Sequence, residues 1–268
     1  MLNGRTALIT GSVAGIGQAV ARALAAEGCN VVITGIEDAA TGDQRKDALI
    51  DEFGIDALYQ QADLRLSDDI ARLVSICLHR FRRVDILINN AVVRHFEIVD
   101  QFPKKAWDEA LAVNLSAPFF LIKSFLPHMR QNGFGRIINM ASIAAVHGIT
   151  KRIDYSTTKA GLLGMTRVVA LENLKSNITC NALLPGSVLT PYSDARIEKM
   201  MVDRTISRDE AVKEFLRGRQ AAERFVEPAG IGAFVVFLCS AAARDITGSA
   251  LPIDIGLTAG SAIESLEK

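Results

Sequence analysis

Short apolar runs alternate along the chain with segments in which apolar residues recur every three or four positions. Runs of the first kind predict β-strands, and the second spacing predicts helices with one buried face. The alternation extends from the first residues to about residue 254. The predicted strands are 6–10, 30–34, 57–62, 84–89, 135–141, 178–184 and 251–254, and the predicted helices are 15–28, 41–53, 67–82, 104–131, 153–174 and 228–240.

Several of the predicted strands are apolar throughout, without a polar face. Segments 86–89 and 136–140 are the clearest examples, and this pattern is typical of parallel sheets covered on both faces. Strand–helix repetition predicts an α/β fold with a doubly wound parallel sheet of the Rossmann type, built with right-handed crossovers. Because no linker rich in Pro, Gly or Ser interrupts the chain, we expect a single domain over residues 1–268.

One segment departs from this rhythm. Residues 191–225, which follow the sixth predicted strand, are polar and rich in arginine and lysine. They predict two short helices inserted at the carboxyl end of a strand, where sheets of this kind bind their ligands. We interpret the segment as a helical substrate lid, with an ordinary solvated helical excursion as the alternative.

Composition and charge exclude several functions. The chain has 49% hydrophobic and 22% charged residues, and its 30 basic and 30 acidic side chains give no net charge. It therefore has no general field to attract nucleic acid or an acidic membrane, and no apolar run approaches the roughly 20 residues of a membrane span. We expect a cytoplasmic protein without signal peptide, metal site, nucleic-acid partner or membrane partner, whose free thiols are buried: Cys29, Cys77, Cys180 and Cys239.

A glycine-rich turn lies between the first predicted strand and the first helix. Gly11 permits a tight turn, Gly15 allows a pyrophosphate to approach the backbone, and Gly17 allows close helix–strand packing. The helix that begins here offers free N–H groups to phosphate. In this strand–turn–helix context the pattern predicts a dinucleotide site that includes Ser12 and Ile16.

The choice between NAD and NADP depends on charge near the adenosine ribose. The glycine turn carries no cation, and the second strand continues through Gly35 and Ile36 into the acidic pair Glu37 and Asp38. A 2′-phosphate would be repelled there, so NAD is the predicted cofactor. Further predicted contacts lie after the third and fourth strands, although the Asn90 amide could instead bond only to backbone: Asp63, Leu64, Asn90 and Ala91.

Four polar residues predict the chemistry. Tyr155 and Lys159 share a helix face, and a nearby ammonium lowers the pKa of a phenol, which makes tyrosine usable as an acid or base near neutral pH. Ser142 follows the fifth strand and can hydrogen-bond a substrate oxygen. Asn114 lies inside a predicted helix, where an amide is unexpected, and can hold a water that relays protons from Lys159.

This ordered set of motifs resembles the short-chain dehydrogenase/reductase family over almost the whole chain. The resemblance implies that Asn114, Ser142, Tyr155 and Lys159 form a catalytic tetrad. It also implies a homotetramer, and a cofactor-binding segment after the sixth strand whose backbone and threonine contact the nicotinamide carboxamide. In this sequence that segment contributes Pro185, Gly186, Val188 and Thr190.

Within that family the chain is most similar to the D-3-hydroxybutyrate dehydrogenases, which use NAD, but its substrate positions differ. The positions that hold a small carboxylate there carry arginine or alanine here, and two tryptophan positions carry smaller residues. The resemblance thus implies the same chemistry on an anionic substrate that is bulkier or more highly charged, such as a hydroxy acid, a sugar acid or a sulfonated sugar. The expected substrate residues, besides Ser142 and Tyr155, are Arg94, Ala144, Arg152, Ser187, Arg196 and Leu257.

Some alternatives stay open at this point. The arginines could face solvent or pair with Asp154, Asp194 or Glu198. Val92 and Ile255 occupy positions that are glycine in the family, so the chain could bind its cofactor weakly or have lost catalysis. The remaining alternatives are D-3-hydroxybutyrate dehydrogenase proper, an NADPH-dependent ketoreductase and a non-catalytic nucleotide-binding protein.

Overall fold

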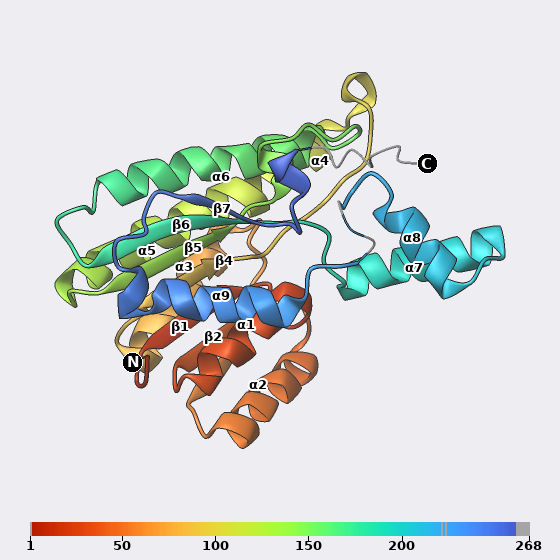
Figure 1. Cartoon of the computed structure of the whole chain (residues 1–268). Helices are drawn as coiled ribbons and strands as arrows, with labels where there is room; N and C mark the ends of the chain where they lie inside the picture. The colour runs from red at the N-terminus through yellow and green to blue at the C-terminus, as the bar shows by residue number, and fades with distance from the viewer. Residues whose placement is uncertain (1, 221, 223, 261–268) are drawn as a thin grey trace.

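The computed structural model describes residues 2–220, 222 and 224–260, so the expected domain (1–268) and lid (191–225) each include residues outside the description. The described chain forms one parallel sheet in the order β3-β2-β1-β4-β5-β6-β7, as Figure 1 shows. The predicted Rossmann-type fold is therefore confirmed. The strands are β1 (Thr6–Thr10), β2 (Asn30–Gly35), β3 (Ala57–Gln61), β4 (Ile86–Asn89), β5 (Gly135–Met140), β6 (Ile178–Pro185) and β7 (Ala250–Ile253).

Helices cover both faces of the sheet (Figure 1). One face carries α1 (Gly15–Ala26), α2 (Ala39–Phe53) and α9 (Pro228–Cys239), and the other carries α3 (Ser67–Phe81), α4 (Lys104–Leu111), α5 (Ala117–Gln131) and α6 (Ile153–Leu171). The strand order reverses at β1, which pairs with both β2 and β4. Ligands of doubly wound sheets bind outside the carboxyl ends of the strands at such a point.

Strand β1 illustrates why the predicted strands lack a polar face. Ala7 and Ile9 enter the core beneath α1 and α9, whereas Leu8 between them enters the core beneath α3 and α5. All three are completely buried. Successive strand residues point to opposite faces, so two helical layers require an uninterrupted apolar strand. The predicted thiols are likewise buried and free: Cys29, Cys77, Cys180 and Cys239.

The long helical segment 104–131 is not regular. A π-helical turn, Ala112–Ser116, separates α4 from α5 and contains Asn114; such turns occur frequently at functional sites. By length and composition the whole segment could cross a membrane, but half of its most apolar window is buried in the domain. Its apolar side chains, such as Leu121 and Phe125, belong to the core, so it is built like a core helix.

The segment expected to form a lid contains α7 (Pro191–Arg204) and α8 (Arg208–Leu216). Both project beyond the sheet in Figure 1. They have an apolar cluster of their own, separate from the two cores of the sheet, and each begins with a capping box at Thr190 or Ser207. The buried members of this cluster are Ile197, Ala211, Phe215 and Leu216.

Of Val92 and Ile255, the two residues at positions that are glycine in the resembled family, only Ile255 has a strained backbone conformation. Among the described residues other than glycine, φ is positive at Arg82, Lys151, Thr205 and Ile255. Val92 is therefore not in a conformation that requires glycine. Ile255, with φ of 54°, does adopt the left-handed region, which costs a branched residue about 1–2 kcal/mol.

Gly17 tests how closely the glycine turn is packed. A Cβ at this position would lie 2.3 Å from the Gly11 carbonyl oxygen and 2.6 Å from the Asn90 amide nitrogen. We therefore expect Gly17→Ala to lower the free energy of unfolding by about 2–3 kcal/mol, as overpacking does. The matched control is Gly164→Ala in α6, where nothing lies within 4 Å of the new Cβ; it should stabilise the helix by roughly 0.5–1 kcal/mol. Urea unfolding of both variants measures the difference, and equal effects would contradict this account.

Candidate active site

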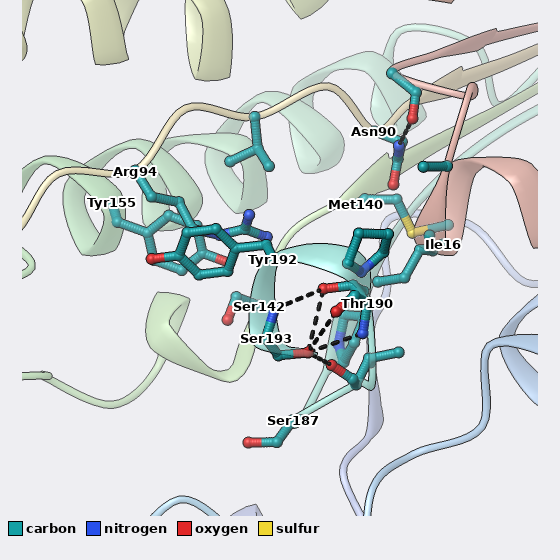
Figure 2. Close-up of a pocket in the computed structure, with 18 of the residues that line it drawn as sticks. Ile16, Asn90, Arg94, Met140, Ser142, Tyr155, Ser187, Thr190, Tyr192 and Ser193 are labelled. Carbon is teal, nitrogen blue, oxygen red and sulfur yellow. Dashed lines mark hydrogen bonds between the residues drawn. The ribbon is translucent and has the colours of Figure 1, made fainter. Parts of the chain in front are cut away.

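A cavity of about 470 Å³ opens at the carboxyl ends of β1, β4, β5 and β6. It extends from the glycine turn to the lid. Figure 2 shows Arg94, Tyr155 and Tyr192 gathered on one side of it and Asn90, Ile16 and Met140 on the other. The structure thus brings the predicted nucleotide-binding and catalytic motifs into one site.

The glycine turn has the conformation that its sequence predicts. Gly11 and Gly15 have φ of 61° and 59°, and both line the cavity together with Ile16. Ser12 is different, because its side chain points into the protein. Its hydroxyl donates to the Ile9 carbonyl (2.7 Å) and accepts from the Thr34 amide (3.0 Å). Neither Ser12 nor Gly17 lines the cavity, so both act on a cofactor by shaping the turn rather than by touching it.

Asn90 also supports the turn. Its amide donates to the carbonyl oxygens of Thr10 (2.9 Å) and Gly11 (2.8 Å), so the alternative of bonding to backbone describes its side chain. These bonds connect the end of β4 to the turn that follows β1. Although the Asn90 side chain bonds to backbone, Asn90 and the adjacent Ala91 and Val92 line the cavity, so this segment can contact a cofactor.

A second hollow, of about 310 Å³, lies beside the first at the ends of β2 and β3. The predicted adenosine contacts Gly35, Ile36, Asp63 and Leu64 all line it, together with Glu37. A dinucleotide that extends from the glycine turn would place its adenosine half in this hollow.

The two acidic residues after β2 have different partners. Asp38 caps α2 by accepting a hydrogen bond from the Thr41 amide (2.8 Å). The Oε2 atom of Glu37 is buried without a hydrogen-bond partner, and this residue lines both hollows. Arg65, which lines the second hollow together with Glu37, is bonded to Asp63 and Glu109. An unpartnered buried acceptor suits the hydroxyls of a ribose, so the residues present fit a dinucleotide.

Tyr155 is surrounded by cations. Its ring lies 4.3 Å from the guanidinium carbon of Arg152 and 5.7 Å from both that of Arg94 and the ammonium nitrogen of Lys159. Burial alone would raise the pKa of Tyr155, but Lys159, Arg94, a hydrogen bond from Ser142 and Arg152 together hold it below its ordinary value. The sequence predicted the effect of Lys159 but not the contribution of the arginines.

Lys159 is held in place by the end of β5. It is 3% exposed and donates to the Met140 carbonyl. Burial lowers the pKa of Lys159 to about 8, against the attraction of Tyr155 and with further lowering by Arg94. Near neutral pH the ammonium is therefore present beside the phenol.

The two other predicted catalytic residues have defined partners. The Ser142 hydroxyl accepts a hydrogen bond from the Ala144 amide (3.1 Å). The Asn114 side chain accepts from the Val93 amide (2.9 Å) and donates to the Val93 carbonyl (3.1 Å) and the Thr158 hydroxyl (3.3 Å). Asn114 thus joins the π-helical turn to the cavity wall and to the helix that carries Tyr155.

The segment after β6 forms the remaining wall, where Pro185, Gly186, Val188 and Thr190 all line the cavity. The Thr190 hydroxyl caps α7 by accepting from the Ser193 amide, and Ser193 bonds back to the Thr190 amide (2.8 Å). Figure 2 shows this cluster at the start of the lid. The expected nicotinamide contact is therefore also the point at which the lid begins.

Of the expected substrate residues, Arg94, Arg152, Ser187 and Arg196 line the cavity. Ala144 does not, because it is 3% exposed, and Leu257 lies in a short turn near the end of the described chain and outside the lining. Two of the three carboxylates considered as partners of these arginines form ion pairs with other residues. Asp154 pairs with His95 (2.9 Å), and Asp194 pairs with Arg208.

Comparisons with known proteins give one consistent result. Residues 11–258 match the family model described as Enoyl-(Acyl carrier protein) reductase. The chain is 37% identical to the D-beta-hydroxybutyrate dehydrogenase of Cupriavidus necator, over 97% of this chain and 100% of that one. It is 34% identical to the enzyme of the same name from Rhizobium meliloti, over 95% and 99%. The chain belongs to the short-chain dehydrogenase/reductase family.

A solved structure supports the same family assignment. The L-sorbose reductase of Gluconobacter frateurii, complexed with NADPH and L-sorbose, superposes with a TM-score of 0.92 at 30% identity, covering 96% of this chain and 97% of that one. This short-chain dehydrogenase/reductase is accordingly an oxidoreductase of the class that interconverts secondary alcohols and ketones, with a Rossmann-type fold that binds a nicotinamide cofactor.

Several lining residues of this short-chain dehydrogenase/reductase were not predicted as site residues, among them three that belong to the lid segment. Tyr192, Phe215 and Arg219 come from α7, α8 and the segment after α8. The sequence shows a basic run in the lid, but nothing in its spacing distinguishes Arg219 from its neighbours. Only the fold of the lid determines which of these side chains face the cavity.

Proposed function

We propose that this protein is an NAD-dependent oxidoreductase that interconverts a secondary alcohol and a ketone on a small anionic substrate. The observation that carries the proposal is the position of Tyr155. Its phenol, flanked by Lys159 and two arginines, lies in the cavity that begins at the glycine turn. A proton-transfer group, a dinucleotide turn and fixed positive charge are thus combined.

The residues divide the reaction between them. When bound, the nicotinamide supplies the acceptor or donor of the hydride. Tyr155, as phenolate, takes the proton from the substrate hydroxyl during oxidation and returns it during reduction. Ser142 donates a hydrogen bond to the substrate oxygen, and Lys159 stabilises the phenolate. Asn114 ties the π-helical turn to Thr158 on the catalytic helix, and it is the proposed holder of a water that relays protons from Lys159.

Glu37 supports NAD as the cofactor. Its buried oxygen would accept from ribose hydroxyls, whereas a 2′-phosphate at the same place would meet an unpaired carboxylate. We expect kcat/KM with NAD⁺ to exceed that with NADP⁺ by at least about tenfold, the effect of 1.4 kcal/mol. Glu37→Gln should lower the ratio of kcat/KM with NAD⁺ to kcat/KM with NADP⁺. The matched change Asp43→Asn in α2 should leave this ratio unchanged. A higher kcat/KM with NADP⁺ would contradict the prediction.

The anionic substrate is supported by the arginines of the cavity. Planar guanidinium groups bind carboxylate, sulfonate or phosphate oxygens, often bidentately. The direct test is a screen of hydroxy acids, sugar acids and sulfonated sugars, by thermal shift with NAD⁺ present and by NADH formation. We expect anionic compounds to be turned over in preference to neutral sugars such as L-sorbose, and 3-hydroxybutyrate to be a poor substrate. Preferential turnover of neutral alcohols would overturn this part of the proposal.

We also propose that the protein functions as a cytoplasmic homotetramer. Of the apolar residues of α6, Leu162, Leu163 and Val169 are buried in the domain, whereas Val168 and Leu171 are exposed. Phe119 and Phe120 on α5 are exposed as well. Packing of these helices against another copy would cover this surface, and light scattering of the purified protein measures the oligomeric state.

A further inference from the structure

The cavity contains two pairs of arginines. The inner pair, Arg94 and Arg152, lies over the Tyr155 ring. The outer pair, Arg196 and Arg219, lies over the Phe215 ring, with guanidinium carbons 5.9 and 4.6 Å from its centroid. Both residues of the outer pair belong to the lid segment, whereas those of the inner pair follow β4 and precede α6.

Neither pair of arginines forms an ion pair within the described part of the chain, and Arg152 is attracted by a nearby carboxylate there, that of Asp154. Across the described ranges 2–220, 222 and 224–260, no carboxylate forms an ion pair with any of the four guanidinium groups. Burial lowers the pKa of Arg219, and repulsion from Arg196 lowers it further. Stacking on an aromatic ring offsets this cost only in part. An anion between two such arginines would relieve the repulsion and complete their hydrogen bonds.

The Phe96 ring contacts one arginine of each pair. The guanidinium carbons of Arg152 and Arg196 are 4.3 and 4.9 Å from the centroid of Phe96. The inner pair lies against the ring of the reacting phenol, whereas the outer pair stacks on Phe215 of the lid. A substrate with an anionic group at each end would reach both pairs.

We propose that Arg196 and Arg219 form a second anion subsite, and that the substrate carries two separate anionic groups. One group lies at the inner pair beside the reacting carbinol carbon, and the other lies at the lid. This inference rests on the proposed function, because Tyr155 places the reacting carbon. It narrows the substrate class to hydroxy or keto dianions, with carboxylate, sulfonate or phosphate at the distal end.

Binding of unreactive dicarboxylates tests the second subsite without turnover. Calorimetry with NAD⁺-loaded protein would compare succinate, glutarate and adipate with butyrate, valerate and hexanoate, the monocarboxylates of matching length. We expect at least one dicarboxylate to bind about tenfold or more tightly than its match, because one charge-assisted hydrogen-bonded group contributes about 1.5–3 kcal/mol. Equal affinities at every length would overturn the proposal.

Variants of the lid assign the effect to the outer pair. Arg219→Gln should reduce the dicarboxylate advantage to about twofold or less while leaving monocarboxylate and NAD⁺ affinity unchanged. The matched control is Arg217→Gln, whose side chain is 76% exposed and paired with Glu214; it should keep the advantage. An advantage that survives Arg219→Gln would overturn the assignment, as would inorganic phosphate that binds as tightly as the best dicarboxylate, because one compact anion would then fill the site.

The two proposals fail in different ways. If no hydroxy compound yields NADH but the dicarboxylate advantage remains, the proposed reaction is wrong and the second subsite stands. If anionic hydroxy compounds are oxidised but dicarboxylates bind no better than monocarboxylates, the reaction stands and the second subsite is wrong. The melting temperature of each variant shows whether it has folded.

Discussion

Tyr155→Phe is expected to lower kcat by about 10³-fold while leaving the affinity for NAD⁺ within about threefold of the native value. Loss of a positioned general acid or base typically costs 10²–10⁴-fold, and no other phenol lies so close to the Lys159 ammonium in the described part of the chain. The ring itself remains, so it still packs against Arg94 and Arg152. Stopped-flow NADH absorbance with an anionic hydroxy acid identified by the screen measures the rate.

The neighbouring residue provides a matched control. Ser156→Ala also removes one hydroxyl from α6, and that hydroxyl has no hydrogen-bond partner. It should change kcat by less than about twofold. If Tyr155→Phe retained more than about a tenth of native kcat with normal folding, another group would have to transfer the proton and the mechanism would be wrong.

Lys159→Met is expected to have the next largest effect, and one that depends on pH. Removing the ammonium leaves the burial that raises the pKa of Tyr155 opposed only by the arginines and Ser142. Less phenolate is then present at neutral pH, so kcat/KM for oxidation at pH 7 should fall by about 10²-fold. Because the phenol must be deprotonated to accept a proton, oxidation should recover as the pH rises, whereas reduction should be less affected at pH 7.

The native profile follows from the same groups. Oxidation by the native enzyme should increase with pH as Tyr155 ionises, below the ordinary phenol pKa near 10. The pKa of Lys159 is about 8, so the ammonium is present below that pH and lost above it, and the increase should level off there. Lys123→Met, which changes an exposed lysine of α5, is the control. An unshifted profile in Lys159→Met would show that Lys159 acts through binding alone.

Much of the fold was predictable because buried positions are occupied by apolar residues in a pattern that depends on the element. A strand covered on both faces is apolar throughout, and a helix packed on a sheet repeats its apolar residues every three or four positions. The observed ends of β1 and α3 differ from their predicted ends by at most one residue. The π-helical turn at Ala112–Ser116 was not predictable from this pattern, because its residues are as apolar as those of a regular helix.

The proximity of Tyr155 and Lys159 on one helix face was predictable because their spacing reflects local geometry. Roles that depend on distant partners were not. Ser12 bonds to Thr34 and Thr190 caps the lid, and neither bond follows from the residue type alone. The contribution of Arg219 depends on the fold of the whole lid, and the sequence does not show that Ile255, but not Val92, has a positive φ.

The separate apolar cluster of the lid has a consequence for how such enzymes diverge. Because Ile197 and Phe215 pack within the lid rather than into the sheet, mutations on α7 and α8 can accumulate with little effect on the stability of the catalytic half. New substrates can thus be acquired by altering one surface insertion while the reaction itself is inherited unchanged. A library confined to residues 191–220 would therefore be the economical starting point for directed evolution of specificity.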